Sequence, residues 1–181
     1  MEEPRARGQS LWLMPDGPAR DHLRGLIERL ADRLGTAPFA PHVTLLPGLS
    51  GPESEVLDRA RVVASELRPL PLAFSGAHGT DAHFRCLFFR VVFTSALWDA
   101  YALAARHFGR EPAETLDPHL SLVYGSLASG PRADLARELS PQLPGPLTAS
   151  HLHVWRTEGP VRDWRELSAL ALGSTSDIQE E

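Results

Sequence analysis

The sequence PHVTLLPG at residues 41–48 is the starting point for the fold, because a near copy of it, PHLSLVYG, stands at residues 118–125. Aligned without a gap, the copies share Pro, His, Leu and Gly, and each carries a hydroxyl residue two positions after the histidine. Both alternate and are rich in aliphatic residues, which predicts two strands. Side chains two apart on a strand point to the same face. His42 should therefore project together with Thr44, and His119 together with Ser121.

The elements around the two copies are predicted to follow the same order: strand, helix, motif strand, helix, strand. The first unit spans about residues 10–76 and the second about residues 83–156, with a final strand at 164–172. From Leu11 to His42 is 31 positions, and from Leu87 to His119 is 32. This agreement indicates an internal duplication of one unit. Two such units packed about a pseudo-twofold axis would place the motif strands side by side at the centre.

Local signals predict where the elements begin and end. Asp16 is placed to cap the first long helix, which should end at Gly35. The run Ser50–Glu53 has the spacing of a capping box before the second helix, and Thr94 or Ser95 is placed to cap the third. A fourth helix is predicted near residues 131–139. The other strands are expected at residues 10–14, 70–75, 84–93, 147–155 and 164–172, with a glycine-containing turn at residues 76–81.

Together these patterns predict an α+β fold. We expect two pseudo-symmetric lobes, each a mainly antiparallel sheet with helices on its outer face, and an active-site groove between them. Residues 1–173 should form this single bilobal domain. The polar, acidic residues 174–181 are expected to be a disordered tail.

Composition narrows the classes of partner. The chain has 181 residues and a formal charge of −5, and all 18 basic residues are arginine. This acidic balance argues against a long nucleic acid as a partner, since nucleic acids bind to basic stripes. A single cysteine, Cys86, cannot form an intrachain disulfide and fits a reducing, cytoplasmic setting. No signal peptide or membrane span is expected, and the protein is expected to be a monomer.

Some other histidines also have a spacing that is typical of a functional site. The run His78-Gly79-Thr80 also fits His-x-Thr, but its glycine-rich surroundings predict a loop. His151 and His153 have a metal-like spacing, yet no cysteine or acidic residue stands near them in the sequence, so a partly buried strand face is favoured. We therefore expect no metal site. The remaining single histidines, His22, His83 and His107, are given no role.

Two histidines and two hydroxyls without a carboxylate, cysteine or metal suit in-line displacement at a phosphate ester. A neutral imidazole can take a proton from water while a protonated one gives a proton to the leaving oxygen. The hydroxyls of Thr44 and Ser121 can donate to the non-bridging oxygens, where charge grows in the transition state. A strained cyclic phosphate would suit such a site.

These paired His-x-Ser/Thr motifs resemble those of the 2H phosphoesterase superfamily. Within it, the segments SLW (10–12), FAPHVT (39–44), FRCLF (84–88) and PHLSLVY (118–124) resemble the plant and yeast cyclic phosphodiesterases. The resemblance implies a catalytic quartet of His42, Thr44, His119 and Ser121, with His119 acting on the water and His42 on the leaving oxygen. It also implies that three aromatic residues contact the nucleoside part of the substrate, namely Trp12, Phe84 and Tyr124.

The activity implied by the resemblance is the opening of small cyclic phosphates without a cofactor. ADP-ribose 1″,2″-cyclic phosphate would give ADP-ribose 1″-phosphate, and nucleoside 2′,3′-cyclic phosphates would give 2′-phosphates. Two alternatives stay open: an enzyme acting on RNA ends, by opening 2′,3′-cyclic phosphates or in the manner of a 2′–5′ RNA ligase, and a nucleotide-binding module without activity. Plant members carry extra cysteines that can pair, which Cys86 alone cannot reproduce.

Overall fold

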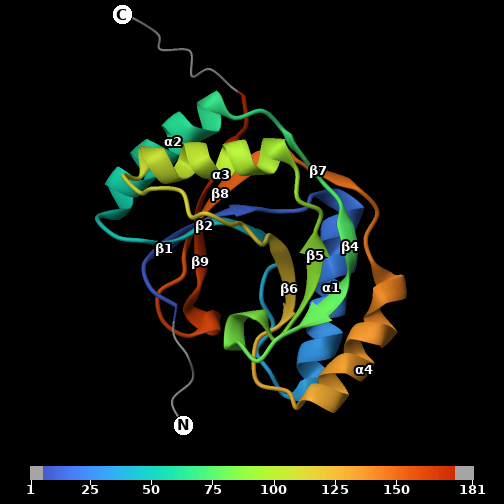
Figure 1. Cartoon of the computed structure of the whole chain (residues 1–181). Helices are drawn as coiled ribbons and strands as arrows, with labels where there is room; N and C mark the ends of the chain where they lie inside the picture. The colour runs from blue at the N-terminus through green and yellow to red at the C-terminus, as the bar shows by residue number, and fades with distance from the viewer. Residues whose placement is uncertain (1–5, 174–181) are drawn as a thin grey trace, which may run out of the picture.

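A computed structural model describes residues 6–173, which form four α-helices and nine β-strands (Figure 1). The helices are α1 (Gly17–Leu34), α2 (Glu53–Glu66), α3 (Ser95–His107) and α4 (Ser129–Leu139). The strands are β1 (Gln9–Leu13), β2 (Val43–Leu49), β3 (Leu70–Leu72), β4 (Phe74–Gly79), β5 (Leu87–Val91), β6 (His119–Val123), β7 (Leu147–Ala149), β8 (His151–Arg156) and β9 (Arg165–Ala171). Short 3₁₀ turns include His83–Arg85 and Val161–Asp163. The expected tail at 174–181 lies outside the described residues.

All pairings between the strands are antiparallel, and the predicted α+β class is confirmed. Seven strands form one sheet in the order β4-β5-β6-β2-β1-β8-β9. The motif strands β2 and β6 are neighbours at its centre, as predicted, but only Val43 and Leu120 pair across them. The expected two sheets are therefore two halves of one sheet, joined by this single pair. We call β4-β5-β6 the first lobe and β2-β1-β8-β9 the second lobe.

The strands of the two sequence units are exchanged between the lobes. β4 comes from the first unit but pairs with β5 of the second, and β8 comes from the second unit but pairs with β1 of the first. The short strands β3 and β7 pair with each other in a separate two-stranded sheet. These pairings are related as a twofold axis would relate them, with β1 matching β5 and β2 matching β6. The two sequence units thus share both lobes instead of each forming its own.

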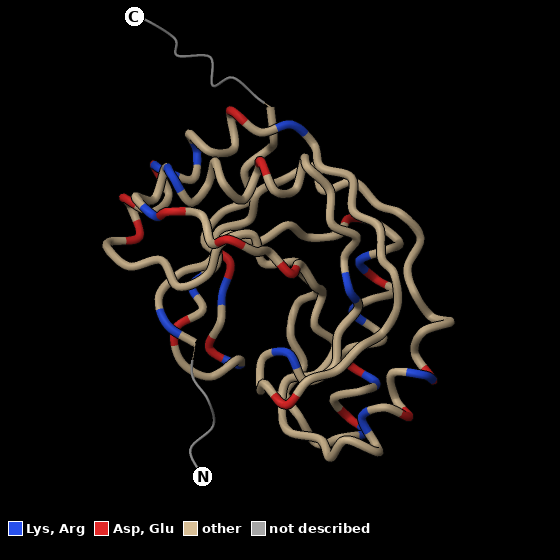
Figure 2. The backbone as a smooth tube through the Cα atoms, in the orientation of Figure 1, with Lys and Arg blue, Asp and Glu red and all other residues tan. Residues whose placement is uncertain are grey.

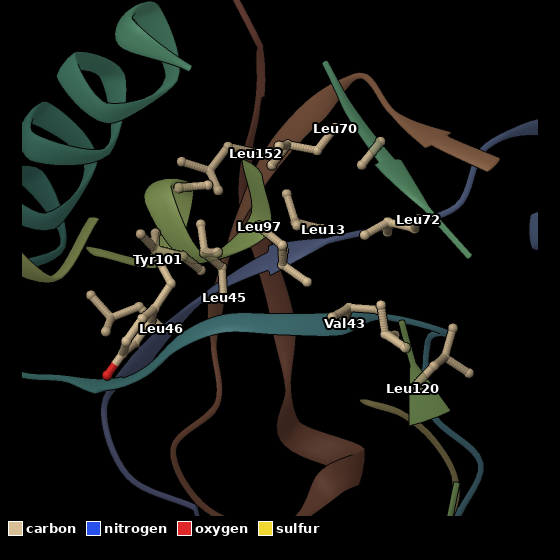
Figure 3. Close-up of a cluster of buried hydrophobic side chains, with 14 of the residues drawn as sticks. Leu13, Val43, Leu45, Leu46, Leu70, Leu72, Leu97, Tyr101, Leu120 and Leu152 are labelled. Carbon is tan, nitrogen blue, oxygen red and sulfur yellow. The ribbon is translucent and has the colours of Figure 1, made fainter. Parts of the chain in front are cut away.

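Each lobe is also covered by one helix from each sequence unit. Helix α1 packs on β6 and α4 on β4, while α3 packs on β2 and α2 on β8 and β9 (Figure 1). The core lies between the helices and the sheet, and it includes Val43 and Leu45 from the first motif (Figure 3). Leu120 lies beside Val43 at the junction of the lobes (Figure 3). Because these residues fill the helix side of the sheet, His42 and Thr44 are left for the opposite side.

Two of the three predicted helix caps are wrong in detail. Asp16 is at the N-cap of α1, but its side chain makes no capping bond and instead accepts a hydrogen bond from Ser150. Helix α2 begins after Pro52 without a side-chain cap, so the capping box is absent. The Thr94 hydroxyl does cap α3, accepting from the Leu97 amide. Gly35 ends α1 in the left-handed conformation, as predicted.

Three strand boundaries also differ from the prediction. The strand expected at 70–75 is divided into β3 and β4, and the turn expected at 76–81 is mostly strand, since β4 extends to Gly79. The strand expected at 84–93 begins only at Leu87, because residues 83–85 form a 3₁₀ turn. The strand expected at 147–155 is interrupted at Ser150, where the chain passes from the small sheet to the large one.

Charged residues are interspersed along the outer helices, with acidic and basic positions close together (Figure 2). Several form exposed ion pairs, such as Arg61 with Asp58 and Arg137 with Asp134. Exposed pairs of this kind contribute little to stability, about 0–1 kcal/mol each. Within residues 6–173, no helix has the length and apolar character to cross a membrane.

Candidate active site

A groove of about 240 Å³ lies where the two lobes meet, on the side of the sheet opposite the helices. All seven residues singled out in the sequence line it: His42, Thr44, His119, Ser121, Trp12, Phe84 and Tyr124. They come from β2 and β6 and the residues directly beside these strands, from β1, and from the 3₁₀ turn before β5. The pairing of β2 with β6 brings together residues that are more than a hundred positions apart, such as Trp12 and Tyr124.

His42 is the more deeply buried of the two motif histidines, with 4% of its surface exposed. Its Nδ1 donates to the Ala40 carbonyl at 2.7 Å, so the lone pair is on Nε2, where the Tyr124 hydroxyl lies 3.4 Å away. The ring stacks on the indole of Trp12, with centroids 3.5 Å apart and planes 8° apart. The pKa of His42 is lowered from 6.5 to about 4, chiefly by burial and also by the nearby His119, while the hydrogen bond to Ala40 opposes this change. His42 is therefore neutral at pH 7 in the ligand-free protein.

His119 makes the same kind of hydrogen bond from Nδ1 to the backbone, but its side chain is less buried than that of His42. Its Nδ1 donates to the Asp117 carbonyl at 3.0 Å, and its ring meets Phe88 edge-on at 5.2 Å. Burial lowers the pKa of His119, while the bond to Asp117 opposes that change. The Asp117 carboxylate also pairs with Arg85 at this margin of the groove. Both histidines thus present Nε2 to the groove, and His119 is the easier one to protonate.

The two motif hydroxyls, of Ser121 and Thr44, differ in whether they already make a hydrogen bond. Ser121 is buried, and its Oγ donates to the Phe84 carbonyl at 3.0 Å. The hydroxyl of Thr44 makes no hydrogen bond within the described part of the chain and is available to a ligand. To donate to a bound phosphate, the Ser121 hydroxyl would have to break its hydrogen bond with the Phe84 carbonyl.

The aromatic residues form a connected cluster around His42. Trp12 is 2% exposed, so it is a core residue as well as part of the groove wall. The Tyr124 ring stacks on Phe39 with centroids 3.9 Å apart, and its hydroxyl lies 3.4 Å from Nε2 of His42. Burial raises the pKa of Tyr124, so the phenol stays protonated and can donate. Phe84 packs edge-on against Tyr124, but it lies in a 3₁₀ turn and not in the predicted strand.

Four residues of this site were not predicted from the sequence. Trp164 lines the groove, within 6.1 Å of Phe84 and 5.8 Å of Tyr124 between ring centroids. Trp155 stacks on the far side of Trp12. Ser10 and Thr157 line the groove and share a hydrogen bond of 3.0 Å. Ser10 could have been found, because it precedes Trp12 by two positions on one strand; Trp164 carries no motif.

The other histidines considered in the sequence lie elsewhere. His78 is in strand β4 opposite Phe88, so its predicted loop is wrong, but it does not line the groove. His153 is hydrogen-bonded through Nδ1 to the Glu166 carboxylate of β9, an acidic partner that the sequence did not suggest. Among residues 6–173, no group of three or more His, Cys, Asp or Glu side chains is placed to hold a metal ion.

Comparisons with known proteins identify the family of this chain. The family described as "Cyclic phosphodiesterase-like protein" matches residues 7–172. A cyclic phosphodiesterase of Arabidopsis thaliana is 24% identical over 127 residues, which cover 70% of each chain.

Solved structures share the fold at low identity. A protein of Thermus thermophilus matches with a TM-score of 0.64 and 18% identity, over 93% of this chain and all of the other. Escherichia coli LigT complexed with 3′-AMP matches with a TM-score of 0.58 and 14% identity, over 93% of this chain and all of LigT. LigT complexed with phosphate also has a TM-score of 0.58, at 12% identity, over 94% of this chain and all of LigT.

Proposed function

Since this chain belongs to the cyclic phosphodiesterase-like family of 2H phosphoesterases, we propose that it opens cyclic phosphodiesters by acid–base catalysis at His42 and His119. The observation that carries the proposal is the shared groove: two imidazoles present Nε2 to one cavity, each held by a backbone carbonyl at Nδ1. The substrates are ADP-ribose 1″,2″-cyclic phosphate and nucleoside 2′,3′-cyclic phosphates. The products are ADP-ribose 1″-phosphate and nucleoside 2′-phosphates.

The proposed reaction is one in-line displacement. Water attacks phosphorus and gives a proton to the neutral imidazole, while the bond from phosphorus to the leaving ring oxygen breaks. That oxygen takes a proton from the second, charged imidazole. Thr44 and Ser121 donate to the non-bridging oxygens as their charge grows. Atoms and charge balance without any cofactor, so no cofactor is part of the proposal.

The surroundings of the histidines favour a definite assignment of these roles. His42 is neutral at pH 7, as a base must be before it accepts a proton, and the less buried His119 is the easier of the two to protonate. We therefore assign the base to His42 and the acid to His119. This is the reverse of the assignment implied by the family resemblance. The leaving-group experiment described in the Discussion distinguishes the two.

The ligand class is supported by the size of the groove and by the comparisons. A groove of about 240 Å³ lined by aromatic rings fits the reacting end of a nucleotide better than a polymer. LigT, which shares the fold, has been solved with 3′-AMP and with phosphate. The chain has no lysine and a charge of −5, which weakens the case for a long RNA partner.

Turnover of adenosine 2′,3′-cyclic phosphate tests the proposal. Purified protein in the presence of a chelator should convert it to the 2′-phosphate, identified by phosphorus NMR. A variant lacking both imidazoles, His42→Ala with His119→Ala, is the control for contaminating activity. Absence of turnover, or turnover that the chelator abolishes and zinc restores, would contradict the proposal. A short RNA ending in a 2′,3′-cyclic phosphate, assayed in parallel, tests the RNA-end alternative.

A further inference from the structure

The ion pair between Arg85 and Asp117 lies directly beside the second motif. Asp117 stands two residues before His119, whereas the matching position before His42 is Ala40, which cannot form an ion pair. We infer that Arg85 is a positioning residue: through Asp117 it holds the His119 ring in place, and the pair sets the charge beside that ring. The inference rests on the proposed function, because it gives a residue outside the groove lining a part in the same reaction.

The backbone at each end of this ion pair holds one functional group of the second motif. The Asp117 carbonyl accepts a hydrogen bond from Nδ1 of His119 at 3.0 Å. The carbonyl of Phe84, the residue before Arg85, accepts one from the Ser121 hydroxyl at 3.0 Å. The Arg85 side chain joins these two segments by donating to the Asp117 carboxylate. Without that contact, Asp117 would be joined to the 3₁₀ turn less firmly, and so would the ring that it orients.

The Arg85 side chain also packs against the residue that contacts His119. Its Cζ lies over the Phe88 ring, 4.7 Å from the centroid, and Phe88 in turn meets the His119 ring edge-on. The Nε of Arg85 is buried and makes no hydrogen bond within residues 6–173, which costs free energy. Half-exposed ion pairs such as this one, with Asp117 48% exposed, contribute little to stability. An effect on His119 therefore accounts for this arrangement better than stability does.

Charges of both signs surround His119. The titratable groups near it come from the 3₁₀ turn, from β5, from the segment before β6 and from across the groove: Arg85, Arg90, Asp117, His42 and Tyr124. Arg90 lies opposite His119 in the sheet, and its Nε is 3.8 Å from the Asp117 carboxylate. Burial lowers the pKa of His119 most, Asp117 raises it, and Arg85 lowers it. Removal of one partner or the other should therefore have opposite effects on protonation of the ring.

The first test measures protonation of His119 without any turnover. Its imidazole signals are followed by NMR as the pH is changed, and they are assigned by their absence from His119→Gln. Arg85→Gln removes a positive charge and should raise the pKa of His119, whereas Asp117→Asn removes a negative charge and should lower it. Because the two effects oppose each other, the double variant should lie closer to the original protein than either single variant.

The second test measures positioning through the rate. With adenosine 2′,3′-cyclic phosphate, Arg85→Gln should lower kcat at the pH optimum by about tenfold, because the ring is held less precisely. KM should change by less than about twofold, since Arg85 does not line the groove. Arg85→Lys keeps the charge but not the planar fork, so it should restore the pKa of His119 and only part of kcat. The limb of the pH–rate profile that His119 governs should move with the pKa measured by NMR.

The control variant is Arg33→Gln on α1. Arg33 forms an ion pair of 2.9 Å with Glu138 of α4, and it does not line the groove. Loss of this pair should leave the pKa of His119 unchanged and kcat within about twofold of the original protein. That result would show that the effects at Arg85 do not come from a general loss of positive charge or of any one ion pair.

The outcomes separate this inference from the proposed function. If the original protein does not turn over the cyclic phosphate, the proposed function fails, while the NMR titration still tests the effect of the ion pair on His119. Shifts of the same sign in Arg85→Gln and Asp117→Asn, or no shift in either, would overturn the role of the pair. An unchanged kcat in Arg85→Gln would overturn the positioning role. Should Arg85→Gln fail to fold, Asp117→Asn and Arg85→Lys test the same contact with smaller changes of shape.

Discussion

His42 lies in the interior between Trp12 and Tyr124, whereas His119 lies at the margin of the same groove beside Phe88. The two residues stand at the same place in a repeated sequence, and each donates from Nδ1 to the carbonyl two residues earlier. The repeat therefore fixes the backbone geometry and the tautomer of both rings. The differing neighbours set the proton affinities, because burial disfavours the charged form more strongly at His42.

The two motifs thus place the same residue types in different surroundings, which is the basis for the two roles proposed above. A symmetrical site would hold two equivalent imidazoles, and neither would be preferred as donor or acceptor. Here aromatic packing from β1 surrounds one of them, since Trp12 and the neighbouring Trp155 stack in line with His42. The other is left near the Asp117 and Arg85 pair, closer to solvent. Four predictions test this comparison, beginning with the one that should change the rate most.

Removal of either imidazole should have the largest effect. His42→Ala and His119→Ala should each lower the rate by about 10²- to 10⁴-fold, because general acid–base catalysis contributes about that much. Circular dichroism would check that both variants remain folded. Full activity in either variant would contradict the proposed pair.

The same two variants can be told apart with an activated leaving group. A leaving group that departs without protonation should rescue the variant that has lost the acid more than the variant that has lost the base. With the roles assigned from burial, a substrate carrying such a group should rescue His119→Ala. Rescue of His42→Ala alone would establish the assignment implied by the family resemblance, and equal rescue would remove the division of roles.

The buried histidine should make stability depend on pH in a predictable direction. His42 has a pKa of about 4 in the folded protein and about 6.5 when unfolded, so the unfolded chain binds more protons between these values. The contribution is fully present above pH 6.5 and is lost as the pH falls toward 4. At pH 4.5 the loss should be about 2.5 kcal/mol relative to pH 7.

Urea unfolding at pH 7 and pH 4.5 measures this loss. The neutral variant His42→Gln should lose less stability between the two pH values than the original protein, by about 2.5 kcal/mol. His119→Gln is the matched comparison and should show a smaller difference, because His119 is less buried. Equal losses in all three proteins would mean that His42 is not held neutral by its surroundings.

The smallest expected effect concerns the hydroxyl nearest His42. Tyr124→Phe removes an O–H that lies 3.4 Å from Nε2 while keeping the ring on Phe39. Since the contact is long, kcat/KM should fall by about three- to tenfold, corresponding to a hydrogen bond of about 1 kcal/mol. Thermal unfolding should be nearly unchanged. A large fall in melting temperature without a kinetic change would make Tyr124 a core residue only.

Trp12 is not suited to the same test, although the family resemblance implies the same role for it. It is 2% exposed and packs on both His42 and Trp155, so its truncation would create a cavity costing about 3–5 kcal/mol. Replacement of Trp12 would therefore lower stability as well as change the groove wall, and the two effects could not be separated. Because the Trp12 ring stacks on His42, its main structural role is to bury that histidine.

Spacing along the chain was enough to identify the proposed catalytic quartet as a geometric set. Alternation on a strand is a local property, so His42 with Thr44 and His119 with Ser121 could be placed on common faces without a structure. The repeat then indicated that two such faces meet. Helix ends marked by Gly35 and Thr94 were predictable for the same reason, since their signals lie within a few residues of the boundary.

The partners that surround this quartet could be found only in the folded chain. The exchange of β4 and β8 between the lobes depends on pairings across distant parts of the chain, which no local pattern encodes. The same holds for Trp164, which reaches the groove from beyond the second unit. The pKa difference between His42 and His119 likewise arises from burial, and burial depends on residues that are distant in the sequence and are brought close by folding.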